Sequence, residues 1–540
     1  MKKSILISIM TSMCFLLQAQ ELHLEWASVA ENTYHWDINN ESKILRARIF
    51  EDSIAVDGQN FTSVGGHDIL IERLDSNGNT IDARQIESIH DKDISDFIYN
   101  ADNDMVLMAG FVDSLNIGLN QTEHWIYTED SISRFVACYD EWFDLKWVNV
   151  IKASSHQMLH AECLLALKDG SVLVSGEYID SLGLEGESDT IFYTNEGFSS
   201  YVVKFDVSGN TVWWNPNFHS EFVTMNRGLD VSNGNGTLNS SSLQISEIAS
   251  FSLEDGSVIW NHLFSMRAHA HAVDADGNIY VTGGFDDDGQ TDFDPGPDTI
   301  SFDPISMDVF LLKLNQDGEF LWAKHIITGD KIDTGTDIYI DDDEVFVTGC
   351  IQRDGDFDPT DNVFELIAHG NEDAFIASYD LDGNLNWADI LKGNSLDVGL
   401  HIESIEDTLL MSGVFLGSID FDLQEGGSVF ESKDGGTEVS NFFVKYLNCS
   451  EINCLTNLQE ENIDNKVSIY PNPAADRMQI ETDQPVTSCH IVDLKGNVII
   501  DIGTLNEDLS TLNISMLPSG IYVLKLYQYN KMESYRFIKI

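Results

Sequence analysis

A repeated alternation of apolar and polar residues is the dominant pattern of this chain. From Asp308 the stretch DVFLLKLNQDGEFLWAKHI has an apolar run, an Asn-Gln-Asp-Gly turn, and a second run that alternates through Phe320 and Trp322. This pattern predicts a β-hairpin, because a period of two places apolar side chains on one face of a strand and Gly permits the turn. The same hairpin recurs from Asp68, Phe135, Tyr201, Ile245 and Ala374. Such repetition predicts a repeat fold.

A second pair of strands recurs between the hairpins, and its second member ends in a small residue and Gly. In chain order this strand reads IAVDG, MVLMAGF, VLVSGEY, IYVTGGF, VFVTGC and LLMSGVF. Together with the hairpins, these strands make units of four that open near Lys43, Ile94, Ala161, Arg227, Ala268, Thr336 and Val398.

The seventh unit has only three strands, whereas the stretch LEWASV at residues 24–29 has no hairpin partner. A strand lent by the N-terminus to the last unit explains both observations and removes exposed sheet edges. We therefore predict an all-β fold with a seven-bladed β-propeller over residues 21–448, closed by an N-terminal strand. The last strands carry a Trp that we expect to pack between blades: Trp26, Trp147, Trp214, Trp260, Trp322 and Trp387. Asp82 takes that place in the first unit.

Both ends of the chain have the composition of export segments. Lys2 and Lys3 precede an apolar run that ends at Gln20, which predicts a cleaved signal peptide over residues 1–20. That run is too short for a stable membrane span and no later run is longer, so we expect no transmembrane segment in the mature chain. Polar residues 449–466 predict a linker, and the alternating strands of residues 467–540 predict a small Ig-like β-sandwich.

This last segment contains four motifs in a fixed order. They are Tyr470-Pro471-Asn472-Pro473, the Asp493–Gly496 turn, the strand start around Gly520 and Tyr522, and the terminal strand that carries Lys539. On these motifs the segment resembles the C-terminal type A sorting domain of the type IX secretion system of Bacteroidetes. The resemblance implies handling by the type IX secretion machinery, removal of this domain, and a protein that is secreted or displayed at the outer cell surface.

The hairpin SLEDGSVIW at residues 252–260 carries a turn and a Trp in the arrangement of known propellers. Residues 24–448 resemble the seven-bladed propeller repeats of bacterial secreted proteins and, more distantly, the quinoprotein-like propellers. The resemblance implies an architecture and no particular chemistry.

The chain is strongly acidic. It has 29 Lys plus Arg and 90 Asp plus Glu, a formal net charge of −61. This charge argues against nucleic acid and anionic membranes as partners, and 43% hydrophobic residues argue against disorder. A solvated acidic surface and cation binding both remain open. A disulfide between Cys449 and Cys454 is also left open.

The long loops of three units share an Asp-Phe-Asp motif within TDFDPGPDT, GDFDPTDN and IDFDLQEGG. Its carboxylates are candidate ligands for Ca²⁺, the one cofactor that the sequence suggests, since calcium takes six to eight oxygen ligands. The alternative is that Asp shapes a turn and Phe plugs the blade edge. The candidate metal ligands are Asp292, Asp294, Asp356, Asp358, Asp420 and Asp422.

The blade-to-blade connections hold several basic residues that are candidate binding residues: His156, His160, Arg267, His269 and His271. His269 and His271 are two positions apart, so on a regular strand both would face the same side. Such a pair could ligate a transition metal or transfer protons, although strand alternation alone also explains it.

No nucleophile elbow, zinc-protease motif, Walker loop or Rossmann fingerprint occurs in the sequence. We therefore predict a non-enzymatic binding module for an extracellular glycan or protein. The alternatives are a polysaccharide-degrading or quinone-dependent enzyme with its site at the mouth of the propeller channel, and a structural component of the cell surface. A tight cluster of His, Arg and carboxylates at that mouth would favour the enzyme, whereas small and aliphatic residues would favour binding.

Overall fold

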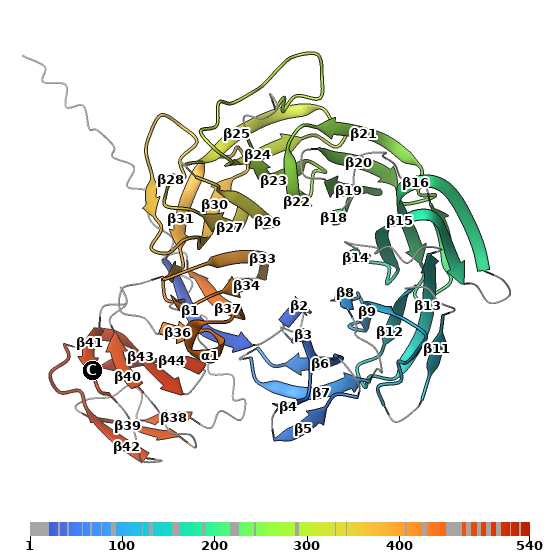
Figure 1. The fold of residues 1–540 in the computed structure, drawn as a ribbon. Helices are drawn as coiled ribbons and strands as arrows, with labels where there is room; N and C mark the ends of the chain where they lie inside the picture. The colour runs from blue at the N-terminus through green and yellow to red at the C-terminus, as the bar shows by residue number, and fades with distance from the viewer. Residues whose placement is uncertain are drawn as a thin grey trace, which may run out of the picture.

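The strands form a ring of antiparallel sheets. The computed structural model describes residues 21–449 and 467–539 apart from short segments within them, which include 154–162, 217–225, 424–428 and 471–476. Within the described residues, seven groups of four strands surround one axis, two of these groups being joined into one eight-stranded sheet, and the C-terminal strands lie outside the ring (Figure 1). The predicted all-β propeller is confirmed, and one short helix, α1 (Lys433–Gly436), is described.

Blades are numbered in chain order, with the strand nearest the axis first. Blade 1 is β2 (Thr33–Ile38), β3 (Ile44–Phe50), β6 (Asp68–Leu74), β7 (Thr80–Ile86); blade 2 is β8 (Asp93–Tyr99), β9 (Met105–Phe111), β12 (Ser133–Tyr139), β13 (Leu145–Ala153). Blade 3 is β14 (Cys163–Ala166), β15 (Val172–Glu185), β16 (Thr190–Phe205), β17 (Thr211–Asn215); blade 4 is β18 (Asn226–Ser232), β19 (Asn235–Ser241), β20 (Ser246–Ser252), β21 (Val258–Phe264). Blade 5 is β22 (Arg267–Val273), β23 (Ile279–Phe285), β24 (Asp308–Leu314), β25 (Phe320–Gly329); blade 6 is β26 (Thr334–Asp341), β27 (Glu344–Ile351), β30 (Asp373–Asp380), β31 (Leu385–Ile390). Blade 7 is β33 (Asp397–Ile405), β34 (Thr408–Phe415), β37 (Ser440–Cys449), β1 (Glu21–Ala30).

Short strand pairs extend the connections between the second and third strands of several blades. They are β4 (Ser53–Val56) with β5 (Gln59–Thr62), β10 (Ser114–Asn116) with β11 (Trp125–Tyr127), β28 (Asp354–Asp356) with β29 (Glu365–Ile367), and β35 (Ser418–Asp420) with β36 (Val429–Glu431). β35 also pairs with β32 (Lys392–Gly393), which lies in the connection from blade 6 to blade 7.

The N-terminal strand closes the ring, as its orphaned pattern predicts. β1 pairs antiparallel with β37 from Glu21 opposite Cys449 to Ala30 opposite Asn441. Leu22, Leu24 and Trp26 are buried, so this strand contributes to the core of blade 7 as well as covering its edge.

The predicted start of the first unit is wrong. Lys43 lies before β3, and the innermost strand of blade 1 is the earlier segment Thr33–Ile38, which pairs with Ile44–Phe50. The IAVDG segment, assigned to the second strand, instead contributes to the β4–β5 pair. The sequence pattern does not separate β3 from the β4 segment, because both are short apolar strands and only strand pairing distinguishes them.

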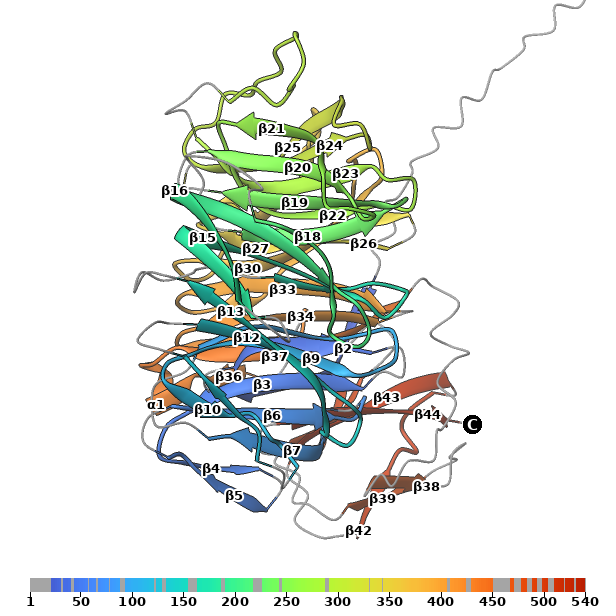
Figure 2. The same ribbon diagram turned by 90° about the vertical axis from the view of Figure 1, so that its right-hand side faces the viewer.

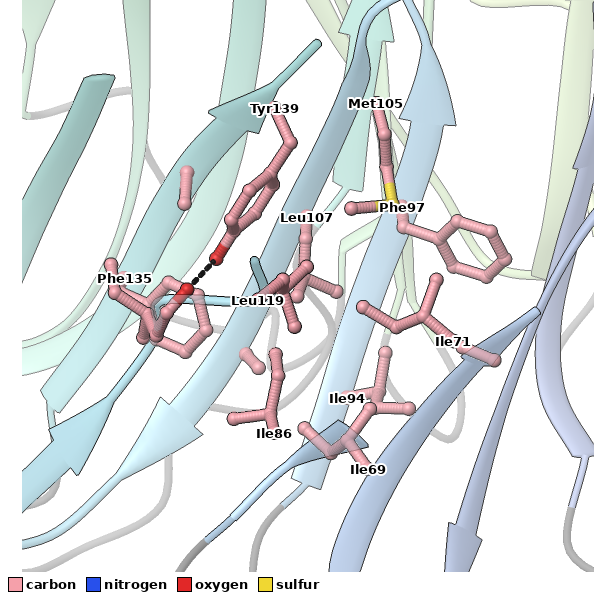
Figure 3. Packing of buried hydrophobic residues seen from close by; sticks show 14 of the residues in the cluster. Ile69, Ile71, Ile86, Ile94, Phe97, Met105, Leu107, Leu119, Phe135 and Tyr139 are labelled. Atoms are coloured by element: carbon pink, nitrogen blue, oxygen red, sulfur yellow. Dashed lines mark hydrogen bonds between the residues drawn. The ribbon is translucent and has the colours of Figure 1, made fainter. Parts of the chain in front are cut away.

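The middle strands are apolar on both faces because each blade is covered by a neighbour on either side. All seven residues of β9 are buried; Leu107 packs with blade 1, whereas Val106 packs with blade 3. Figure 3 shows the first of these interfaces, where Ile69 and Ile71 meet side chains of blade 2. Burial on both faces explains near-continuous apolar runs such as β24.

The Trp of an outer strand packs against the hairpin turn of the next blade. Trp147 donates its Nε1–H to Val207 O at 3.2 Å, and a Cβ added to the turn glycine Gly209 would lie 2.6 Å from its ring. The same arrangement joins Trp26 to Gly78, Trp213 to Gly256, Trp260 to Gly318, and Trp322 to Gly383. In blade 3 the residue in this contact is Trp213, so the prediction of Trp214 is wrong by one position.

The exception in blade 1 has a physical reason. Phe143 occupies the turn of blade 2 with φ 62°, where other blades have glycine. Arg73 and Arg84 of blade 1 lie over the Phe143 ring at 4.5 and 5.2 Å, and both pair with Asp82. An aromatic ring in the turn thus replaces the Trp on the strand, and the guanidinium groups complete a cation–π contact.

The C-terminal region consists of two antiparallel sheets with a shared core. One sheet contains β38 (Val467–Tyr470), β39 (Arg477–Thr482) and β42 (Leu509–Asn513), and the other β40 (Ser488–Val492), β41 (Val498–Asp501), β43 (Gly520–Gln528) and β44 (Lys531–Lys539). β44 lies against β1, and Figure 2 shows β43 and β44 beside the propeller. Lys525 forms a buried ion pair with Asp422 of the propeller.

Candidate functional site

The inner strands carry polar side chains where their pairing is irregular. A register shift interrupts β2, β8, β18, β22, β26 and β33 in their pairing with the next strand outward. A β-bulge of this kind re-aims side chains and bends the strand. The irregularity therefore places polar residues near the axis of a ring whose middle strands are apolar.

Aspartates on four inner strands bind the main chain of the next blade. Leu164 N–H donates to Asp96 Oδ2 at 2.7 Å, and Val273 N–H donates to Asp230 Oδ2 at 2.7 Å. Asp37 accepts from Tyr99 N–H and Asp337 from Ile402 N–H in the same way. These bonds hold the carboxylates in defined positions and link adjacent blades.

Five of these inner-strand side chains form what we call the axial acidic cluster: Asp37, Asp96, Asp337, His401 and Glu403. They come from blades 1, 2, 6 and 7, whose inner strands meet around the axis (Figure 1). His401 Nδ1 lies 2.6 Å from Asp337 Oδ2, and the Trp36 ring contacts the imidazole edge-on at a centroid distance of 4.9 Å. The His401 side chain is 47% exposed and the carboxylates are partly exposed, so the cluster is accessible to solvent.

Burial, together with the charges of neighbouring groups, shifts the pKa values of the residues in this cluster. Burial raises the pKa of Glu403 to about 8, aided by the Asp37 charge, and burial raises the pKa of Asp37 to about 6. Burial also raises the pKa of Asp96 to about 7. The pKa of His401 rises to about 9 because Asp337 and the other carboxylates outweigh its desolvation. At neutral pH the cluster holds one imidazolium among carboxyl groups that compete for protons.

The Asp-Phe-Asp motifs make turns in the structure. Asp292 Oδ1 accepts the main-chain N–H groups of Asp294 and Ile300, two and eight residues later, and Asp356 Oδ1 accepts those at the same offsets. Asn116 makes the same two bonds in blade 2, so a neutral amide oxygen is sufficient for this role. The phenylalanines between the aspartates are fully buried: Phe293, Phe357 and Phe421.

The remaining aspartates of these motifs are also engaged in protein contacts. Asp294 accepts Gly296 N–H, Asp358 accepts Thr360 N–H, Asp420 accepts Asp422 N–H, and Asp422 is paired with Lys525. The described residues contain no group of three or more His, Cys, Asp or Glu arranged to hold a metal ion. Calcium binding at these loops stays a prediction, while the contacts match the turn-and-plug alternative.

His269 and His271 point to different neighbours. The register shift between Ala268 and Ala270 breaks the strand alternation, so the expectation that both face one side is wrong. His269 Nδ1 lies 2.9 Å from Gly335 O of blade 6, whereas His271 is buried against Gly228 of blade 4. Burial lowers the pKa of His271 to about 4, so it is neutral at physiological pH.

Arg267 is the remaining predicted binding residue that the structure describes. Arg267 pairs with Asp286 at 3.1 Å, and His156 and His160 lie outside the described residues. Their binding role stays a prediction. The axial acidic cluster was missed because its aspartates come from distant units, although the Asp-rich first strand of each unit was a signal for them.

Known proteins resemble this chain in two respects. Residues 468–540 match the secretion system C-terminal sorting domain. The structure is similar to the Neurospora crassa Pan2 WD40 domain (11% identity, TM-score 0.41, covering 79% of this chain and 97% of that one) and to the phage phi92 endosialidase (10% identity, TM-score 0.37, covering 96% and 87%). These likenesses are too weak to carry an argument about activity. No curated protein matches the sequence.

The sorting domain establishes the route of the protein. The chain is exported through the type IX secretion system, and the product is attached to the cell surface or released. In the predicted sorting motif, Tyr470 ends β38, Gly520 and Tyr522 lie in β43 and Lys539 ends β44, whereas Pro471, Asn472 and Pro473 lie outside the described residues. No helix among the described residues has the length and hydropathy needed to cross a bilayer.

Proposed function

We propose that this exported propeller is a binding module that takes a positively charged group of an extracellular ligand at the axial acidic cluster. The observation that carries the proposal is the convergence of Asp37, Asp96, Asp337 and Glu403 from four blades on one partly exposed place. Propellers present loop-built and axial surfaces on a rigid frame, which suits binding. A formal charge of −61 would also attract cationic ligands over a distance.

The protonation of the cluster supports a cationic ligand. The raised pKa values of Glu403 and Asp37 mean that ionising both is unfavourable in the unbound protein. A bound cation would offset this repulsion and favour the ionised forms. Binding should therefore release protons and strengthen as the pH rises from 6 to 8.

The fixed geometry of the aspartates also supports binding. Asp37 and Asp96 each accept a main-chain N–H from their own strand and one from the next blade. Side chains held in this way lose little conformational freedom when a ligand arrives, so less of the interaction energy is spent on ordering.

An extracellular enzyme that degrades polysaccharides is a second candidate. It is favoured by one observation: Glu403, with a pKa of about 8, interacts with Asp37, whose pKa is about 6. At neutral pH one carboxyl group is protonated and the other ionised, which is the division of roles that glycoside hydrolysis requires. An enzyme site at the channel mouth is expected to contain His, Arg and carboxylates. The described members of the axial acidic cluster include a histidine and carboxylates but no arginine.

Titration calorimetry with a glucosamine pentasaccharide, which is cationic, tests the binding proposal against its neutral N-acetylated counterpart. We expect binding of the cationic oligomer alone, and an affinity about 10-fold or more weaker for Asp37→Asn, because a charged hydrogen-bond partner contributes about 1.5 kcal/mol or more. Asp230→Asn is the matched control, since Asp230 makes the same cross-blade bond outside the cluster. Equal losses in the two variants, or equal binding of both oligomers, would refute the proposal. Release of reducing sugar that depends on Glu403 would favour the enzyme.

A further inference from the structure

The third strand starts with a buried polar residue in blades 1, 2, 4, 5, 6 and 7, and the identity of that residue differs between blades. Blades 1, 5 and 6 have an aspartate there, Asp68, Asp308 and Asp373, each with no exposed surface. A buried carboxylate is costly unless a donor or a positive charge compensates it. The groups that compensate the buried carboxylate differ from blade to blade.

Blades 1 and 5 supply a side-chain nitrogen from the outer strand. Gln85 Nε2 donates to Asp68 at 2.7 Å, and His325 Nε2 lies 2.8 Å from Asp308 Oδ2. Both partners occupy the same register position, opposite the residue two places after the aspartate. In blade 6 that position is Ile390, opposite Phe375, and it offers no nitrogen.

In blade 6 two main-chain groups donate to Asp373, His369 N–H at 2.6 Å and Gly370 N–H at 3.0 Å, and a second carboxylate lies near it. The segments 370–373 and 395–397 run side by side: Asp397 N–H donates to Glu372 O at 2.7 Å, and Asn371 N–H donates to Ser395 O at 2.6 Å. Asp397 has no exposed surface, and a Cβ on Gly393 would lie 1.3 Å from its Oδ2. The negative charge of Asp373 adds to burial in raising the pKa of Asp397 to about 8.

Asp397 lacks the compensation found at the equivalent place in the preceding blade. There Asp333 accepts Gln352 N–H at 2.8 Å. The corresponding Leu416 N–H instead donates to Leu396 O at 2.8 Å. Among the described residues neither carboxylate oxygen of Asp397 has a hydrogen-bond partner. The basic side chain paired with Asp373 is His369, at 3.9 Å and 55% exposed.

We propose that the Asp373–Asp397 pair, between blades 6 and 7, is a binding site for one Ca²⁺ ion. Asp397 offers two buried oxygens without a hydrogen-bond partner in the described part of the chain, and each oxygen of Asp373 accepts one main-chain N–H and keeps a lone pair, so the pair supplies the hard oxygen ligands that calcium takes. The described residues contain no group of three or more His, Cys, Asp or Glu arranged to hold a metal ion, so main-chain oxygens and water would complete the coordination. The ion would sit beside Asp373 as the His325 imidazole sits beside Asp308 in blade 5, and it would join blades 6 and 7.

Calcium titration of the full chain, by calorimetry and by thermal unfolding with magnesium as the comparison ion, tests this site. We expect one strong site and a rise in Tm of about 2 °C or more at millimolar calcium, because an ion that binds only the folded state stabilises it by mass action. Asp397→Asn should weaken binding at least 10-fold and abolish the rise in Tm. Ile390→His, which supplies the imidazole that blade 5 has at this position, should also weaken binding.

Two controls separate this site from the other acidic groups. Asp292→Asn changes an Asp-Phe-Asp loop, where Asn116 shows that an amide is tolerated, and Glu403→Gln changes the axial acidic cluster; both should keep the calcium response. In EDTA, Asp397→Asn should melt no lower than the natural chain, which shows that its lost response is not misfolding. An unchanged calcium response in Asp397→Asn, or no response in the natural chain, would overturn the proposal. Loss of the response in Asp292→Asn or Glu403→Gln alone would overturn it as well.

Discussion

Substitution of Gly209 by alanine measures how strongly the Trp–turn contact holds the blades together. Gly209 has φ 81°, and a Cβ there would lie 2.6 Å from the ring of Trp147 in the preceding blade. The left-handed conformation costs alanine about 1 kcal/mol, and forcing a methyl group into a packed contact adds about 1–3 kcal/mol. We expect Gly209→Ala to destabilise the fold by about 2–4 kcal/mol.

Gly234 provides the matched control. It has φ 84° in another hairpin turn, but no atom lies within 4 Å of its added Cβ. Gly234→Ala should therefore show the conformational cost alone, about 1 kcal/mol. Thermal unfolding followed by calorimetry compares the two, with about 1–2 °C expected per kcal/mol for a domain of this size.

A double-mutant cycle tests the assigned cause. If the Trp147 ring is the obstacle, Gly209→Ala should cost little more than Gly234→Ala in a Trp147→Leu background, because the clash has been removed. Equal destabilisation by the two alanine variants in the natural background would show that the Trp–turn contact does not constrain the turn.

Three further predictions concern protonation, reactivity and closure. Glu403 has its pKa raised from 4.5 to about 8, so its contribution to stability is complete below pH 4.5 and is lost as the pH rises through 8. Glu403→Gln should therefore lose less stability than the natural chain between pH 5 and 9 in urea titrations. Cys138 and Cys350 are buried, with thiol pKa values raised to about 12, so mass spectrometry should find both unlabelled by iodoacetamide at pH 8 until the chain is unfolded. Trp26→Ala should destabilise the fold by about 3–5 kcal/mol in the same unfolding assay, because Trp26 is buried at the seam and donates to Ser76 O; a change below 1 kcal/mol would contradict that role.

The sequence predicted the architecture because a propeller is made of local repeats. Hairpin turns, apolar middle strands and an outer Trp are each visible within about 20 residues, and the strand around Trp26 was recognised as the closing strand because its own neighbourhood offers it no partner. The motif order from Tyr470 to Lys539 likewise identified the sorting domain.

The predictions that are wrong concern which way a side chain faces, and this depends on how the strands pair. Whether Trp213 or Trp214 faces the next blade follows from strand register, since a shift of one residue exchanges the faces of a strand. Because of the bulge between Ala268 and Ala270, His269 contacts blade 6 whereas His271 contacts blade 4. No property of the RAHAHAV stretch indicates an extra residue at that point.

The sequence by itself determined the all-β repeat fold, the closure of the ring and the export route, because each can be recognised from residues that lie close together in the chain. Only the tertiary structure decided which of the 90 acidic residues act together. Asp37 and Glu403 are more than 360 residues apart in the chain yet share one electrostatic environment. Asp373 lies near Asp397 because the segments that carry them are hydrogen-bonded side by side. A carboxylate acquires its role from its burial and from the charges around it, and the ring brings these together from distant parts of the chain.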